Sequence, residues 1–195
     1  MLEIIFATNN AHKVQEIRNR TEGFLKVISL KEAGIHETIP EPFNTLKENA
    51  SAKSKFIYKR LHKNCFSEDT GLFVEALDGE PGVHSARYAG DDANDSANVE
   101  KLIHKMFGKE NRKASFITII SLMLEGKEYF FEGRCTGHIV EIANGDMGFG
   151  YDPVFMPDGS NKTFGEMNMD EKNEFSHRRK AVDQLLSFLE KEKDE

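Results

Sequence analysis

The segment Ala-Ser-Phe-Ile-Thr-Ile-Ile-Ser-Leu-Met-Leu, residues 114–124, is followed after Glu125-Gly126-Lys127 by a second long segment, residues 128–142. Apolar and polar residues alternate along both segments, as they do in strands with one buried face. A short connection containing glycine is typical of a β-hairpin. The two segments therefore predict long antiparallel strands and exclude an all-helical protein.

Helices and further strands flank this hairpin. Residues 2–8 are too apolar for a loop and too short for a helix, so they predict a buried strand. Segments 64–69 and 71–77 predict two more strands around a sharp turn, and segment 144–175 is irregular. Apolar residues recur at helical spacing in residues 11–20, 45–62, 93–107 and 177–191. The predicted fold class is mixed α/β, with a long, partly antiparallel central sheet and flanking helices.

Length, charge and hydropathy narrow the function classes. The chain has 195 residues, 38 % of them hydrophobic, and 26 Lys and Arg against 33 Asp and Glu give a net charge of −7. This length supports one domain whose core needs no disulfide, so we expect Cys65 and Cys135 to be buried thiols. The acidic balance argues against binding polymeric nucleic acid. The longest apolar stretch, residues 116–124, is too short for a membrane helix, and residues 1–10 lack signal-peptide features. We therefore expect a cytoplasmic protein without a membrane partner.

The first candidate site is the stretch Thr8-Asn9-Asn10-Ala11-His12-Lys13, where a strand ends and a helix begins. Backbone N–H groups and the positive end of the helix dipole attract anions at such a position, and Lys13 adds a full charge. The stretch lacks the glycines of a P-loop. The alternative is an ordinary capped helix with a solvated lysine.

A second candidate site combines a lysine with carboxylates. Lys53 falls on the apolar stripe of helix 45–62, so its ammonium either meets a negative partner or extends past the helix edge. The carboxylates of the adjacent Glu68 and Asp69 repel each other, and a bound divalent cation would offset this repulsion. Glu41 is a further candidate ligand, and magnesium is the cation that we favour. Alternation along a strand sends Glu68 and Asp69 to opposite faces, so we expect one direct ligand and favour Asp69. A simple turn at Asp-Thr-Gly is the alternative.

Two later segments carry further candidate ligand groups. Gly148-Phe149-Gly150-Tyr151-Asp152-Pro153 places aromatic rings among glycines, which suits a base-binding loop or a tight structural loop. Lys172 and the run Ser176-His177-Arg178-Arg179-Lys180 put positive charge at the start of the last helix, where it opposes the helix dipole. These charges indicate an anionic or carbonyl partner, or else a solvated surface.

Six motifs, in this order, resemble the inosine triphosphate pyrophosphatases, also called non-canonical purine nucleoside triphosphate pyrophosphatases. Together they extend over nearly the whole chain and are highly specific. They are Thr-Asn-x-x-x-Lys at 8–13, Glu-Asn-Ala-x-x-Lys at 48–53, Glu-Asp-Thr-Gly-Leu at 68–72, Pro-Gly-x-x-Ser-Ala-Arg-Tyr at 81–88, Phe-Gly-Tyr-Asp-Pro at 149–153 and Ser-His-Arg at 176–178. The chain departs from the family at Asn9-Asn10, where many members have a glycine, and at Glu68, where aspartate is common. Neither change removes a needed charge.

The resemblance implies Mg²⁺-dependent hydrolysis of ITP, dITP or XTP to the monophosphate and pyrophosphate by a cytosolic homodimer. It also implies an elongated mixed sheet with two lobes around an active-site cleft. Glu41 and Asp69 would be the metal ligands, and Asp69 would also be the proton acceptor. Residues 8–13 and Lys53 would hold the triphosphate, and Thr70 would contact the nucleotide. The base pocket would consist of Phe149, Gly150, Tyr151, Asp152, Lys172, His177 and Arg178.

Two alternatives are compatible with these residues. A related pyrophosphatase acting on pyrimidine or modified nucleotides would share the metal ligands and differ in the base pocket. A nucleotide-binding protein without catalysis would need the basic groups but not Glu41 and Asp69.

Overall fold

A computed structural model of the chain describes residues 2–92 and 94–194 and has the predicted mixed α/β fold. The backbone divides into two compact units. Unit 1 comprises Met1–Asp69, Thr118–Gly133 and Arg178–Glu195, and unit 2 comprises Thr70–Ile117 and Arg134–His177. The predicted single domain with a cleft between two lobes stays a prediction.

The sheet of unit 1 has the strand order β2-β1-β3-β5-β6. The full bounds of these strands are, in that order, Leu25–Ser29, Leu2–Phe6, Cys65–Val74, Lys113–Leu124 and Lys127–Ile139. β1 is parallel to both of its neighbours, and Phe6 lies opposite Phe66 of β3. Parallel strands of this kind are buried on both faces, which explains the short apolar run at the end of β1.

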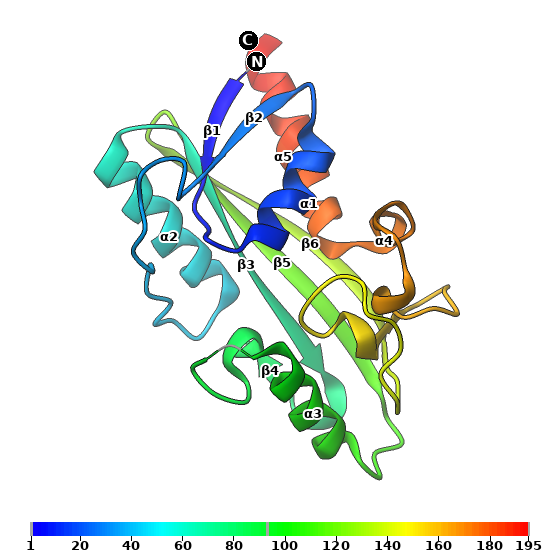
Figure 1. Cartoon of the computed structure of the whole chain (residues 1–195). Coiled ribbons are helices and arrows are strands. Elements are labelled where there is room, and N and C mark those ends of the chain that lie inside the picture. The colour runs from blue at the N-terminus through cyan, green and yellow to red at the C-terminus, as the bar shows by residue number, and fades with distance from the viewer. Residues whose placement is uncertain (1, 93, 195) are drawn as a thin grey trace. The chain divides into compact units, whose positions relative to one another are not determined.

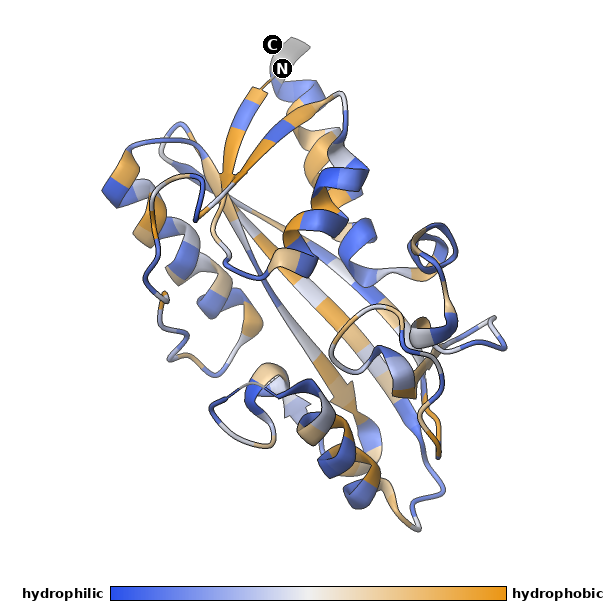
Figure 2. Ribbon diagram, viewed as in Figure 1, coloured by the Kyte–Doolittle hydropathy of each residue, from blue (hydrophilic) through white to orange (hydrophobic). Residues whose placement is uncertain are grey.

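Helices cover both faces of the sheet of unit 1 (Figure 1). On one face α1 (Ala11–Thr21) and α5 (His177–Asp194) pack over a core that contains Phe66. On the other face α2 (Leu46–Leu61) inserts Ile57 into a second core. Figure 2 shows the matching pattern, because β1 is largely hydrophobic while α1 carries both hydrophobic and hydrophilic residues. Both faces are therefore closed by amphipathic helices.

Unit 2 has its own core, in which Phe155 and Phe164 are fully buried. Its strand order is β4-β3-β5-β6-β7. The elements found only in this unit are β4 (Pro81–Gly82), β7 (Phe155–Pro157), α3 (Asp95–Met106) and α4 (Met169–Phe175). Short 3₁₀ turns connect them at Glu75–Leu77, Ser85–Arg87, Asp152–Val154 and Phe164–Glu166.

The turn predicted at residues 68–71 is wrong, because β3 runs without interruption from Cys65 to Val74. Gly71 serves close packing instead: a Cβ there would lie 2.5 Å from the carbonyl oxygen of Gly82 in β4. A glycine that allows two backbones to approach and a glycine that makes a turn look the same in sequence. Residues 68–70 are therefore successive residues of one strand.

The other predicted elements are confirmed with shifted ends. The predicted helix at 93–107 is α3, and residue 93 lies outside the described residues. The strand predicted at 128–142 ends at Ile139, and segment 144–175 contains β7 and α4 besides loops. The short strand β2 was not predicted, since five residues carry too little periodicity. Cys65 and Cys135 are buried free thiols, as predicted.

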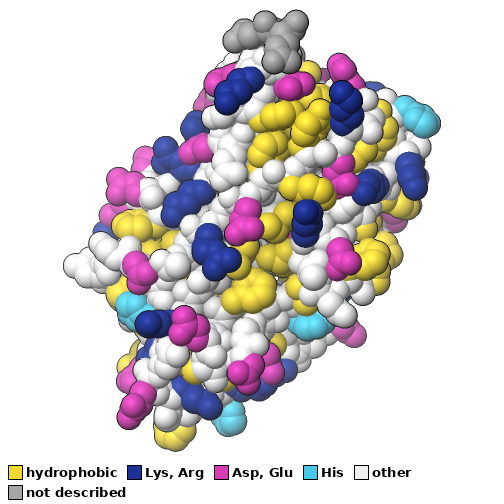
Figure 3. Space-filling model, turned by 180° about the vertical axis from the view of Figure 1, so that it is seen from behind, with side chains coloured by type: hydrophobic (Ala, Val, Ile, Leu, Met, Phe, Trp, Pro, Cys, Tyr) yellow, Lys and Arg dark blue, Asp and Glu magenta, His cyan; other side chains and the backbone are white. Residues whose placement is uncertain are grey.

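Charges of both signs are interspersed on the face of the molecule that Figure 3 displays. Within residues 2–92 and 94–194, no helix has the length and apolar character needed to cross a membrane. The cytoplasmic location and the lack of a nucleic-acid partner stay predictions.

Candidate active site

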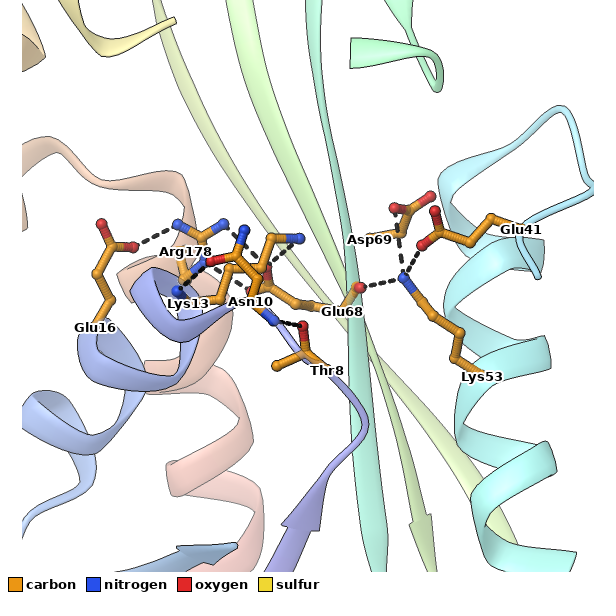
Figure 4. A network of polar contacts seen from close by, with 9 residues as sticks. All are labelled: Thr8, Asn10, Lys13, Glu16, Glu41, Lys53, Glu68, Asp69 and Arg178. Atoms are coloured by element: carbon orange, nitrogen blue, oxygen red, sulfur yellow. Dashed lines mark hydrogen bonds and ion pairs between the residues drawn. The ribbon is translucent and has the colours of Figure 1, made fainter. Parts of the chain in front are cut away.

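β3 sends two adjacent carboxylates to opposite faces of the sheet of unit 1, as the strand period of two requires (Figure 4). Glu68 points toward α1 and α5, and Asp69 points toward α2. Both side chains are buried, with residual exposures of 2 % and 7 %. The two carboxylates therefore belong to separate groups of charges.

Glu68 lies in a buried, balanced group of four charges. Its carboxylate accepts hydrogen bonds from Arg178 Nε at 2.8 Å and Nη2 at 2.9 Å, and Lys13 Nζ lies 2.9 Å from Oε1. Arg178 also pairs with Glu16 of α1. Burial by itself would raise the pKa of Glu68, but Arg178 and Lys13 hold that pKa well below its ordinary value. Glu68 is thus ionised and fixes the heads of both cations.

Residues 8–13 form the capped start of α1, as predicted. The Asn10 side chain accepts a hydrogen bond from Lys13 N at 3.1 Å, and Thr8 Oγ1 accepts one from Asn10 N at 3.2 Å. Asn9 donates to the carbonyl oxygen of Glu37 at 3.4 Å. Ala11 and His12 are exposed in the first turn. The structure therefore brings Lys13 and the exposed start of a helix together, the combination that favours an anion.

Asp69, Glu41 and Lys53 form the second group of charges, in which two carboxylates face one ammonium (Figure 4). Lys53 Nζ pairs with Glu41 Oε1, donates to the carbonyl oxygen of Glu68 at 2.8 Å and lies 3.7 Å from Asp69 Oδ1. Lys53 is 7 % exposed, so its ammonium does not extend past the helix edge into solvent. Burial and the nearby Glu41 raise the pKa of Asp69, although Lys53 acts against them. This group carries one net negative charge when both carboxylates are ionised.

The donor set of Glu41 and Asp69 fits a magnesium ion that is shared with a ligand. Mg²⁺ prefers oxygen donors, retains several waters and is usually bound by one or two carboxylates together with substrate phosphates. In the described part of the chain no group of three or more His, Cys, Asp or Glu side chains could hold a metal by itself. The unbalanced charge of this group supplies the attraction for a cation.

Four predicted base-pocket residues come together in unit 2. Lys172 Nζ donates to Asp152 Oδ2 at 2.7 Å and lies 5.2 Å from the centroid of the Phe149 ring. Phe149 N donates to the same carboxylate oxygen at 2.9 Å. Gly150 follows in the loop at φ +60. Lys172 and Asp152 are buried, so the loop is organised around an ion pair.

The structure gives the remaining predicted residues other surroundings. Tyr151 is buried, and its hydroxyl donates to the carbonyl oxygen of Ser85 at 2.7 Å. The His177 ring stacks on Phe116, with centroids 4.6 Å apart and an interplanar angle of 10°. The guanidinium of Arg178 pairs with Glu68 and Glu16 in unit 1. The predicted base contacts of Tyr151, His177 and Arg178 stay predictions.

Thr70 follows Asp69 in β3 and is partly buried. Its predicted contact with the nucleotide stays a prediction.

Sequence reasoning missed two carboxylates. Glu16 lies three residues after Lys13 on α1, and this helical spacing was the signal that could have grouped them. Asp95 accepts a hydrogen bond from Gly150 N at 2.8 Å. A pair separated by 55 positions leaves no sequence signal in one chain.

Fold and site together define a mixed α/β protein whose central strand presents carboxylates to lysines from two flanking helices. The chain belongs to the Ham1 family, whose model matches residues 4–188. The family resemblance of the six motifs is confirmed by this match and by the names of relatives.

Relatives and a solved structure match over nearly the full length. The chain is 50 % identical over 190 residues to the dITP/XTP pyrophosphatase of Porphyromonas gingivalis, covering 97 % of this chain and 98 % of that protein. It is 45 % identical over 199 residues to the dITP/XTP pyrophosphatase of Caldanaerobacter subterraneus subsp. tengcongensis, covering 100 % of both chains. The structure of the Staphylococcus aureus Ham1 protein is similar with a TM-score of 0.88 at 38 % identity, covering 97 % of this chain and 99 % of that chain.

Proposed function

We propose that this chain hydrolyses dITP, ITP and XTP to the nucleoside monophosphate and pyrophosphate, with Mg²⁺ as its cofactor. The observation that carries the proposal is the group in which Glu41 and the buried Asp69 face the buried Lys53. Such a group attracts a cation, and the cation in turn attracts a polyphosphate. The names of the relatives, dITP/XTP pyrophosphatases, support the choice of substrate.

In the proposed reaction, the oxygen of a water molecule bonds to the α-phosphorus while the bond from that phosphorus to the bridging oxygen breaks. Pyrophosphate leaves, and Asp69 takes the proton of the water. Lys53 and Lys13 place positive charge near the triphosphate. Glu41 and Asp69 would hold the magnesium ion, which when bound neutralises charge on the phosphate oxygens.

Residues 8–13 would receive the phosphates through the N-terminus of α1. Glu68 would keep Lys13 oriented while remaining ionised. Thr70 would contact the nucleotide from the next position of β3.

We assign base recognition to Phe149, Gly150, Asp152, Lys172 and His177 of unit 2. The Lys172 ammonium, which donates to Asp152, is the group that we assign to the 6-keto oxygen, because an ammonium only donates hydrogen bonds. Adenine carries an amino group at that position, which would leave a buried donor facing another donor. Selection for hypoxanthine and xanthine bases over adenine follows from this chemistry.

The test measures pyrophosphate release with and without magnesium over ITP, dITP, XTP, ATP, GTP, dGTP, CTP and UTP. We expect magnesium-dependent release with a large preference for ITP, dITP and XTP over ATP. A preference for pyrimidine or modified nucleotides would favour the related pyrophosphatase instead. Nucleotide binding without pyrophosphate release would indicate a non-catalytic binding protein.

The resemblance to the family also supports a cytoplasmic homodimer, which we propose as the working form. Light scattering of the purified chain measures the mass, and a monomer at assay concentration would contradict the dimer.

A further inference from the structure

The motif at residues 81–88 lies in unit 2 and has no role in the proposed phosphate and metal chemistry. Its Ser85 is buried, and the Ser85 hydroxyl accepts a hydrogen bond from Leu72 N at 2.9 Å and donates one to Gly82 O at 2.6 Å. Gly82 lies opposite Leu72 in the register of β3 and β4. Ser85 therefore fastens this segment to β3 two residues beyond Thr70.

The same serine anchors the loop at residues 148–152. Tyr151 is 4 % exposed, and its hydroxyl donates a hydrogen bond of 2.7 Å to the carbonyl oxygen of Ser85. The Tyr151 ring belongs to the core of unit 2. Tyr151 is thus placed to hold the loop from inside, not to stack on a base.

Two carboxylates hold the loop beside Tyr151. Asp95, the first residue of α3, accepts a hydrogen bond from Gly150 N at 2.8 Å, and Asp152 accepts one from Phe149 N at 2.9 Å. Gly148 lies at φ +80, and a Cβ there would be 2.0 Å from Asp152 Oδ2. The backbone at Gly148 therefore lies close against the Asp152 carboxylate.

We propose that Tyr151, through Ser85, and Asp95 are positioning residues for base recognition. Their hydrogen bonds fix the 148–152 loop to β3 and to α3, so that Phe149 is held in place before a nucleotide binds. When the loop is ordered before the nucleotide binds, less of the binding free energy is lost in ordering it. This inference rests on the proposed function, which assigns base recognition to the loop.

The substitution Tyr151→Phe removes one hydroxyl and keeps the ring. Tyr88→Phe is the matched control, because Tyr88 belongs to the same core and its hydroxyl donates at 2.8 Å to Glu80, outside the loop. We expect Tyr151→Phe to raise KM for dITP and XTP by about 3- to 10-fold with kcat within about twofold. The reason is that the lost hydrogen bond supports the bound substrate and the transition state to the same extent. Tyr88→Phe should leave both constants within about twofold.

Competitive inhibition by inorganic triphosphate separates positioning of the base loop from general damage, because this compound carries no base. Its inhibition constant should be the same for wild type and Tyr151→Phe. Equal KM values for Tyr151→Phe and Tyr88→Phe would overturn the inference. A rise in the triphosphate inhibition constant of Tyr151→Phe in proportion to its rise in KM would overturn it as well. Wild-type protein that hydrolyses neither dITP nor XTP contradicts the proposed function itself, and the inference falls with it.

Asp95 provides an independent variant at an exposed position, which serves if Tyr151→Phe does not fold. Asp95→Ala removes the acceptor for Gly150 N and should raise KM by about 3- to 10-fold. Asp95→Asn keeps an acceptor oxygen and should therefore have a KM close to that of the wild type. Equal KM values for wild type, Asp95→Ala and Asp95→Asn would overturn the role of Asp95.

Discussion

Asp69 and its neighbour Glu68 are both buried, yet their pKa values move in opposite directions. Burial and Glu41 raise the pKa of Asp69, and Lys53 compensates only in part. Burial acts on Glu68 as well, but Arg178 and Lys13 outweigh it and lower the pKa. In the absence of a metal ion, Asp69 therefore binds a proton more readily than Glu68, which stays ionised.

Asp69→Asn should lower kcat for dITP by about 10²- to 10⁴-fold, because the amide cannot accept a proton and is a poor magnesium ligand. Asp183→Asn, at a partly exposed position on α5, is the matched control and should keep full activity. Near-normal turnover of Asp69→Asn at saturating magnesium would exclude Asp69 as the base.

Glu68→Gln should lower the free energy of unfolding at pH 7 by about 3–5 kcal/mol, because Arg178 is left buried without its main counter-charge. The folded-state pKa of Glu68 is lowered, so its stabilisation is complete above the unfolded value near 4.5 and is lost as pH falls through the folded value. The stability gap between wild type and Glu68→Gln should therefore narrow below pH 4.5. Chemical denaturation across pH measures it, with the exposed Glu3→Gln as the control. A gap independent of pH would contradict the assignment.

At the scale of elements, β3 separates the two groups of charges because it continues through residues 68–70 as a strand. α1 and α5 supply the partners on one face, and α2 supplies Lys53 on the other. The sequence predicted that Glu68 and Asp69 point to opposite faces, which is confirmed, but it did not predict that the strand continues through Thr70.

The cap of α1 is an element-scale test. Asn10→Ala and Asn94→Ala each remove an N-cap side chain, at α1 and at α3, and each should cost about 0.5–2 kcal/mol of unfolding free energy. Only Asn10→Ala should also weaken inhibition by inorganic triphosphate, since only that cap lies in the proposed phosphate segment. Equal inhibition constants for the two variants would remove residues 8–13 from the phosphate site.

At the scale of the whole molecule, the cores of both units are built from hydrophobic side chains. We therefore expect folding not to depend on a bound metal, in contrast to small domains that need a structural ion.

Chelation of magnesium by EDTA should abolish pyrophosphate release and leave the far-ultraviolet circular dichroism spectrum unchanged. Return of magnesium should restore the rate, whereas calcium, which is larger and less strict in geometry, serves as the control ion. Full activity in EDTA, or unfolding on chelation, would contradict the shared-metal site.

Much of the fold and of the candidate site could be predicted from local pattern. The hairpin of β5 and β6 follows from alternation, and the start of α1 follows from polar residues after a buried strand. The path of β3 could not be predicted, because the reason for a glycine at residue 71 lies in another strand. The backbone of Gly82 comes so close to residue 71 that no Cβ fits between them. The pairing of Arg178 with Glu68 joins residues separated by 110 positions, and a single sequence contains no record of that distance.

The sequence by itself determined the mixed α/β class, the capped helix starts and the residue types that can meet a metal and phosphates. These depend on the spacing of apolar residues and on the chemistry of single side chains. Only the tertiary structure decided how these charges are grouped: Lys53 with Glu41 and Asp69, Arg178 with Glu68 and Glu16, Tyr151 with Ser85. The physical reason is that burial obliges each polar group to find a partner, and the fold alone determines which partner lies within reach.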